Sequence, residues 1–338
     1  MSENHSHGAD PADPADLAQG IAEAVALRNS CLSLLEKGEY DRAEPILAES
    51  VAMLRSLAAL DPHAVGPQLG LGLKPLAALA VAGSNYGRAR QLATEALPLL
   101  RQGVTERPSQ YVASLSRVLW YLAESLCQVG EPEPALPLLD EAIELVDHPG
   151  FAPDPVVAAL LSDVRLAVDL REVVLFRCLR TRLEALQRLH RTDEALIAAL
   201  EAVDVGRLLA QRAPDRYSPL MARVLTRLAL MHEQSDGPAA GAFRQESLPY
   251  WYAAAVHQRE RLGPDPQAAP QMLRFALIKE LMPFGLELVR LGRGPEALPS
   301  AREAVDLARA LAAENPDKWQ SVFETCQKHL AGLEHRPW

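Results

Sequence analysis

The chain has 338 residues, of which 49% are hydrophobic and only 5% aromatic, and its formal net charge is −10. An acidic molecule repels polyphosphate, so the composition argues against a nucleic-acid partner. The first twenty residues hold no apolar run, and no later stretch reaches the roughly 18 uninterrupted apolar residues of a membrane span. We therefore expect a cytoplasmic protein with neither membrane nor nucleic acid as its partner.

A core of Leu, Ala and Val with few aromatic residues favours packed helices over sheets. In chain order, we expect a disordered leader over 1–16 and then one continuous helical array over 17–331. Its repeats are predicted near 17–62, 63–108, 109–155, 156–214, 215–266 and 267–319. A capping helix over 320–331 and a tail over 332–338 complete the chain.

These boundaries rest on one recurring phrase. An Ala is followed six residues later by Glu, and the chain is apolar sixteen and nine residues before each Ala. Two apolar positions seven residues apart lie on one face of a helix, so a helix precedes each Ala. The leading residues are Ala43, Ala89, Ala135, Ala195, Ala240 and Ala297. In four copies a Pro follows the Ala after 19 residues: Pro62, Pro108, Pro214 and Pro316.

The leading Ala residues are separated by 46, 46, 60, 45 and 57 residues, and the two long intervals locate insertions. In the first, a helix is predicted from Val156 to about Leu189. In the second, Pro249 is predicted to open an extended helix that ends near Gly263. Turns between helices are marked by glycines, which end helices readily in the left-handed conformation: Gly38, Gly87, Gly130, Gly237 and Gly292.

The order of apolar, small, apolar and Ala positions resembles the tetratricopeptide repeat family. Intervals near 46 residues exceed that family's period of about 34 residues and are closer to elongated, bacterial or actinobacterial-type repeats. HEAT repeats are the alternative within the same architecture. The resemblance implies an all-α fold, a right-handed α-α superhelix (TPR-like solenoid) of about six helical hairpins and a C-terminal capping helix.

The sequence holds no catalytic or ligand motif. There is no Gly-rich phosphate loop, no nucleophile elbow and no zinc-protease signature. The Glu of each repeat recurs at one structural position, which indicates a solvated or capping role and not acid/base catalysis. The four cysteines are far apart and are predicted to be buried, reduced thiols. We therefore predict no enzyme, no cofactor and no metal site.

In the family that the repeats resemble, the first helix of each hairpin lines an inner groove. At the matching positions here, basic side chains outnumber acidic ones, which predicts a groove that attracts carboxylates or phosphates. The predicted partner-binding residues are Arg28, Asn29, Lys74, Arg117, Trp120, Tyr121, Glu124, Arg177, Arg180 and Arg188. Tyr250, Trp251 and Tyr252 are secondary candidates.

Two alternatives stay open for these residues. The arginines could instead pair with Glu124 and Glu184 across adjacent helices, and residues 250–252 could fill the core. For the whole chain, the leading hypothesis is a protein-interaction scaffold that binds an extended, acidic partner segment, with a homodimer as a further possibility. The alternatives are a sensor or regulator that binds a small molecule or signalling peptide, and a helical enzyme or an enzyme's accessory subunit.

Overall fold

The computed structural model describes residues 14–36, 39–152, 170–234, 237 and 239–336. Within these ranges the chain is helical, with no strand. It forms two compact units that divide between Arg191 and Thr192. The predicted all-α repeat architecture is confirmed. Residues 1–13 of the predicted leader over 1–16 and the start of the predicted helix from Val156 lie outside the described residues. Residues 14–16, predicted to be disordered, belong to a helix that begins at Pro14.

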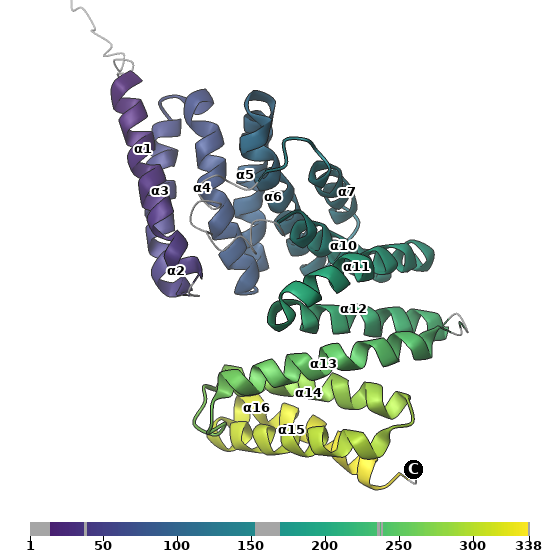
Figure 1. The fold of residues 1–338 in the computed structure, drawn as a ribbon. Coiled ribbons are helices and arrows are strands. Elements are labelled where there is room, and N and C mark those ends of the chain that lie inside the picture. Colours follow the sequence, from purple (N-terminus) through teal and green to yellow (C-terminus); the bar gives the residue numbers. More distant parts are fainter. Residues whose placement is uncertain (1–13, 37–38, 153–169, 235–236, 238, 337–338) are drawn as a thin grey trace, which may run out of the picture. The chain divides into compact units, whose positions relative to one another are not determined.

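The first unit contains eight described helices, and Figure 1 shows them following one another along the chain. They are α1 (Pro14–Ser30), α2 (Leu32–Glu36), α3 (Tyr40–Ala58), α4 (Pro62–Ala82), α5 (Tyr86–Glu106), α6 (Pro108–Gln128), α7 (Ala135–Val146) and α10 (Leu170–Arg188). Among the described helices, each of α3 to α7 packs against the one before it and the one after it. The first helices of the hairpins, α1, α4, α6 and α10, also pack against one another in this order.

The second unit contains six described helices. They are α11 (Thr192–Arg212), α12 (Pro214–Gln234), α13 (Ala240–Leu262), α14 (Gln271–Arg290), α15 (Gly294–Glu314) and α16 (Pro316–Glu334). Each packs against the next. The boundary between the two units falls between α10 and α11, inside the range predicted as the fourth repeat, 156–214. Helix α16 is longer at both ends than the predicted cap over 320–331.

The recurring prolines begin helices. Pro62, Pro108, Pro214 and Pro316 are the first residues of α4, α6, α12 and α16, where proline costs no hydrogen bond because that N–H has no partner within the helix. Asp61 caps α4 by accepting from the backbone N–H groups of His63 and Ala64, both at 3.0 Å. The constant interval from Ala to Pro therefore fixes where the next hairpin starts.

Four helices end in the same left-handed turn. The residue five positions before the leading Ala has a positive φ after α4, α6, α10 and α14: Ser84 (58°), Gly130 (88°), His190 (58°) and Gly292 (72°). In each case the next N–H donates to a carbonyl five residues back, as in the Schellman motif. Gly87 lies inside α5 and is not the turn residue that the sequence suggested.

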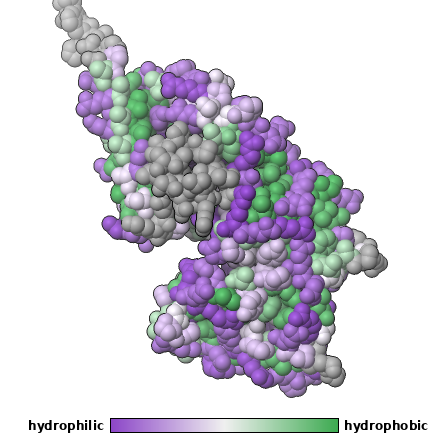
Figure 2. Space-filling view, in the orientation of Figure 1, coloured by the Kyte–Doolittle hydropathy of each residue, from purple (hydrophilic) through white to green (hydrophobic). Residues whose placement is uncertain are grey.

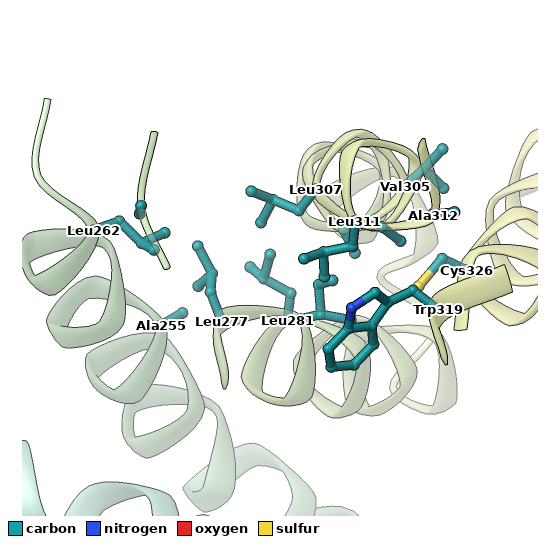
Figure 3. Packing of buried hydrophobic residues seen from close by; sticks show 14 residues of the cluster. Ala255, Leu262, Leu277, Leu281, Val305, Leu307, Leu311, Ala312, Trp319 and Cys326 are labelled. Atoms are coloured by element: carbon teal, nitrogen blue, oxygen red, sulfur yellow. The ribbon is translucent and has the colours of Figure 1, made fainter. Parts of the chain in front are cut away.

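The leading Ala residues form a buried row, and five of the six have no exposed surface. Helices also approach closely at Gly103, where a Cβ atom would lie 2.7 Å from the ring of Tyr111. In the second unit, Leu281, Leu311 and Trp319 meet between α14, α15 and α16 (Figure 3), and the Trp319 indole N–H donates to Gln271 Oε1 at 3.1 Å. Helix α16 therefore covers an apolar face of the last hairpin.

Helix α4 is the one described helix that is long and apolar enough to cross a membrane, but 61% of its most apolar window is buried in the molecule. That degree of burial is expected of a core helix in a packed array. On the face shown in Figure 2, hydrophilic residues predominate, and hydrophobic residues form smaller groups among them.

Ion pairs connect the second helices of neighbouring hairpins at recurring positions. The Glu of the recurring phrase accepts two hydrogen bonds from an Arg of the preceding second helix. The pairs are Arg55–Glu95, Arg101–Glu141, Arg207–Glu246 and Arg259–Glu303. We name this set the Arg–Glu ladder. Because its members are partly exposed, each pair contributes at most about 1 kcal/mol, so the ladder sets register more than it sets stability.

Candidate functional site

A buried chain of hydrogen bonds joins α6 to α10. The indole N–H of Trp120 donates to Thr181 Oγ1 at 3.0 Å, and the Thr181 hydroxyl donates to Glu124 Oε2 at 2.6 Å. All three side chains are buried. Two of the predicted partner-binding residues, Trp120 and Glu124, therefore hold these helices together from the inside.

Two carboxylates and two guanidiniums extend this chain of hydrogen bonds. Arg180 Nη2 lies 3.2 Å from Glu124 Oε2, and Arg188 Nη2 lies 2.7 Å from Glu184 Oε1. The Gln128 amide donates to both carboxylates, at 3.3 and 3.2 Å. Arg188 also donates to the carbonyl oxygen of Cys127. The positive charges of Arg180 and Arg188 are therefore matched within the protein.

Burial raises the pKa of Glu124, but the Arg180 guanidinium and the hydrogen bonds from Thr181, Arg180 and Gln128 outweigh it, so the pKa lies below its ordinary value. The carboxylate is held ionised. For the neighbouring Cys127 thiol, burial and the nearby carboxylates raise the pKa to about 12, so it is not a nucleophile at neutral pH.

We expect Glu124→Gln to lower the free energy of unfolding by about 1 kcal/mol at pH 7, because it removes the charge that Arg180 and Thr181 were arranged around. The folded pKa of Glu124 is depressed, so its contribution is present above the unfolded pKa and is lost as the pH falls below about 4. The variant should therefore lose less stability on acidification than the wild type. Urea unfolding at several pH values measures this. Glu49→Gln, at an exposed carboxylate, is the control, and an equal response of both variants would contradict the assignment.

Beside this network, an aromatic pair lies between two arginines. The rings of Trp120 and Tyr121 are 4.8 Å apart at 51°. Arg117 Nη2 donates to the Tyr121 hydroxyl at 2.9 Å, and the Arg177 guanidinium carbon lies 4.9 Å from the centre of the Trp120 ring. Both arginines are half-buried. Among the described contacts of Arg117, the hydrogen-bond partner is a neutral hydroxyl and not a carboxylate.

The remaining candidates of the first unit lie on α1 and α4. Arg28 is buried and donates to the Asn29 side-chain oxygen at 3.3 Å. Lys74 Nζ donates to Ser114 Oγ, on α6, at 2.9 Å. All ten primary candidates are therefore carried by the first helices α1, α4, α6 and α10, as the repeat pattern placed them.

The secondary candidates belong to the second unit and separate by burial. Trp251 is buried, and its indole N–H donates to Thr226 Oγ1 at 3.2 Å. Tyr250 is half-buried, whereas 57% of Tyr252 is exposed, with its ring 6.3 Å from that of Phe284. Core filling therefore describes Trp251, and only Tyr252 presents a largely exposed ring.

The predicted partner-binding residues do not include Thr181, Gln128 or Ser114, although each forms a hydrogen bond to one of them. One signal was available for Thr181, because a buried Trp N–H requires an acceptor. The residue of α10 that accepts this hydrogen bond is set by how α6 and α10 are aligned along their lengths. That alignment cannot be read from one sequence.

Among the described side chains, no group of three or more His, Cys, Asp or Glu residues could hold a metal ion. All four cysteines are buried and unpaired, as the sequence indicated: Cys31, Cys127, Cys178 and Cys326.

No protein-family model and no curated protein matches this chain. Solved structures that match this chain include BtubC (BKLC) from P. vanneervenii, at 16% identity over 87% of this chain and 92% of that chain, with a TM-score of 0.43. The PH0952 protein from Pyrococcus horikoshii, a signal transduction ATPase with a tetratricopeptide repeat sensor, matches at 10% identity over 94% and 43%, with a TM-score of 0.44. The S. pombe nuclear import adaptor Nro1 matches at 12% identity over 91% and 99%, with a TM-score of 0.41.

This chain spans less than half of PH0952. At such identities and TM-scores, these similarities say nothing about what the chain binds. The class follows from its own helices: it is a helical-repeat protein.

Proposed function

We propose that this chain is a non-enzymatic interaction scaffold with elongated, tetratricopeptide-like repeats of bacterial type, active in the cytoplasm. It binds an extended, acidic segment of a partner protein without a cofactor. The observation that carries the proposal is the Trp120–Tyr121 pair, with Arg117 and Arg177 against its rings. Aromatic and Arg side chains dominate the binding energy of protein interfaces, and a guanidinium on an aromatic face is well placed to pair with a carboxylate.

The contacts divide the predicted site into two roles. Arg180 and Arg188 form ion pairs with Glu124 and Glu184, so their charges are neutralised inside the protein. In this proposal these two arginines position α6 against α10. The guanidiniums of Arg117 and Arg177 lie at the rings of Tyr121 and Trp120. In this proposal Arg117 and Arg177 contact the partner's carboxylates, the buried rings of Trp120 and Tyr121 hold the two guanidiniums in place, and Lys74 extends the basic surface along α4.

The test is a titration of the full chain with a fluorescein-labelled, Glu-rich peptide, followed by anisotropy at low and moderate salt. We expect Arg117→Gln/Arg177→Gln to weaken binding about tenfold, which corresponds to about 1.4 kcal/mol. Its matched control is Arg302→Gln/Arg309→Gln, which removes two exposed arginines of α15 and should leave binding unchanged.

A peptide with Gln in place of Glu should bind more weakly and lose its salt dependence. If the Glu and Gln peptides bind equally, or if the two double variants behave alike, acidic-segment recognition at this site is wrong. Arg180→Glu is unsuitable as a test, because it would place a second negative charge against Glu124 and disturb the fold itself.

A further inference from the structure

One side of α14 reaches the surface of the second unit and is largely apolar. Met272 and Leu286 are 58% and 40% exposed, and the apolar residues between them are half-buried. The buried residues of α14 lie on the other side of the helix, which packs against α13 and α15. A continuous apolar surface of this kind marks an interaction site, whereas single exposed apolar residues do not. We name it the α14 face, and its apolar residues are Met272, Phe275, Ala276, Met282, Pro283 and Leu286.

The charges of α14 are divided between its interior and its surface. Both carboxylates of the helix, Glu280 and Glu287, are buried and paired with an Arg at 2.7 Å. Lys279 is exposed in the middle of the α14 face, and its ammonium lies 5.8 Å from the centre of the Phe275 ring. Among the described ion pairs of α14, none includes Lys279, whereas Arg290 is paired with Glu287. The α14 face therefore presents apolar side chains around one positive charge.

The spacing of the α14 face favours a helix as its partner. Met272, Phe275, Lys279, Met282 and Leu286 are separated by three and four residues in turn, which is the seam on which a second helix packs. The face offers few polar groups to the backbone of an extended segment, whereas a helix bonds its own backbone. The seam spans about 21 Å along the axis, so a partner helix of about four turns covers it.

We propose that the α14 face binds an amphipathic helix of a partner protein that carries a Glu or Asp in the middle of its apolar stripe. The carboxylate pairs with Lys279, and the apolar side chains on either side of it contact Met272, Phe275, Met282 and Leu286. A polar residue inside an apolar seam fixes the register of the two helices, because any other alignment leaves its charge against an apolar side chain.

A second copy of α14 fits this face less well than such a partner. In an antiparallel pair related by a two-fold axis at the middle of the seam, Lys279 would lie against its counterpart, and like charges at an interface oppose association. The inference does not rest on the acidic-segment site around Trp120, because the α14 face belongs to the second unit.

The experiment titrates the full chain with three fluorescein-labelled, hydrocarbon-stapled helices and follows fluorescence anisotropy. The three peptides share one leucine stripe of about four turns and differ only in the middle residue of that stripe, which is Glu, Gln or Lys. We expect the Glu peptide to bind most tightly and the Lys peptide to bind about tenfold or more weakly. Lys279→Glu should reverse this order, so that the Lys peptide binds the variant most tightly.

A second pair of variants tests the apolar contacts. Met272→Glu places a charge on the α14 face at an exposed position, so the fold is preserved and the Glu peptide should bind about tenfold more weakly. Ile197→Glu is the matched control, because Ile197 is 57% exposed on α11 of the same unit, and it should bind like the wild type.

Three outcomes would overturn the proposal. The wild type could bind none of the peptides or all three equally, or Lys279→Glu could leave their order unchanged. Sedimentation could also show that the chain self-associates and that Met272→Glu, but not Ile197→Glu, makes it monomeric, in which case a second copy occupies the face. Arg117→Gln/Arg177→Gln should leave binding of the stapled helices unchanged, so this proposal and the proposed function can fail separately.

Discussion

Arg244→Met is expected to lower the free energy of unfolding by about 3–5 kcal/mol, the largest effect predicted for this chain. Arg244 and Glu287 are 2% and 1% exposed, and Arg244 Nη1 lies 2.7 Å from Glu287 Oε2. Without the guanidinium, the basic partner left to the buried Glu287 among the described ion pairs is Arg290, whose side chain is 39% exposed. The Glu287 carboxylate would then be buried away from water without a buried basic side chain to neutralise its charge.

The sharper test is the double variant Arg244→Met/Glu287→Leu. A buried pair replaced by apolar side chains of similar size costs less than the removal of one partner, because no buried charge is left alone. Urea unfolding should therefore find the double variant more stable than Arg244→Met. Arg293→Gln, which removes an arginine from an exposed pair with Glu296, is the control and should leave the free energy of unfolding almost unchanged. If the double variant is less stable than Arg244→Met, the pair itself is the source of stability.

Gly103→Ala is expected to cost about 2 kcal/mol, although Ala is the better helix former. A Cβ atom at this position would lie 2.7–2.9 Å from three ring atoms of Tyr111, which is buried and whose hydroxyl accepts from Gln68 at 3.1 Å. The ring cannot move without loss of packing and of that hydrogen bond. Overpacking costs about 1–3 kcal/mol, and the gain from replacing a helical Gly is only about 0.5–1 kcal/mol.

Gly87, on the same helix, is the matched control because nothing lies within 4 Å of a Cβ atom there. Gly87→Ala should raise the midpoint of thermal unfolding slightly, whereas Gly103→Ala should lower it by several degrees. Equal midpoints for the two variants would show that α5 and α6 are not packed as closely as described.

The repeat could be predicted because it depends on local chemistry. The leading Ala residues are buried since a larger side chain would separate the helices, and this constraint leaves a countable pattern. The turn residues between the helices were harder to predict from the sequence. Ser84 and His190 adopt the left-handed conformation without being Gly, so the sequence pointed to Gly87 instead. Helix α13 begins at Ala240 and contains Pro249, so the prediction that Pro249 opens the helix was wrong. In α13 tertiary packing outweighs the helix-breaking tendency of proline.

The candidate site was predictable by position but not by role. The repeat pattern placed Arg117, Arg177 and Arg180 on first helices. Only the contacts show that Arg180 faces Glu124 and that Arg117 and Arg177 lie at aromatic rings. The Glu of each repeat was predicted to have a solvated or capping role, but in four repeats it pairs with an Arg of the preceding second helix, 39 to 44 residues away. Pairing over that distance depends on how the hairpins stack.

The Arg–Glu ladder makes the two sides of the first unit respond differently to salt. Exposed ion pairs are screened at moderate ionic strength, where the Debye length falls to about 8–10 Å, while buried contacts are not. In the first unit, the first-helix side holds the buried network around Glu124, and the second-helix side holds Arg55–Glu95 and Arg101–Glu141. Salt should therefore weaken contacts on the second-helix side alone. The bending stiffness of the unit then depends on ionic strength, while the packing order of its helices does not change.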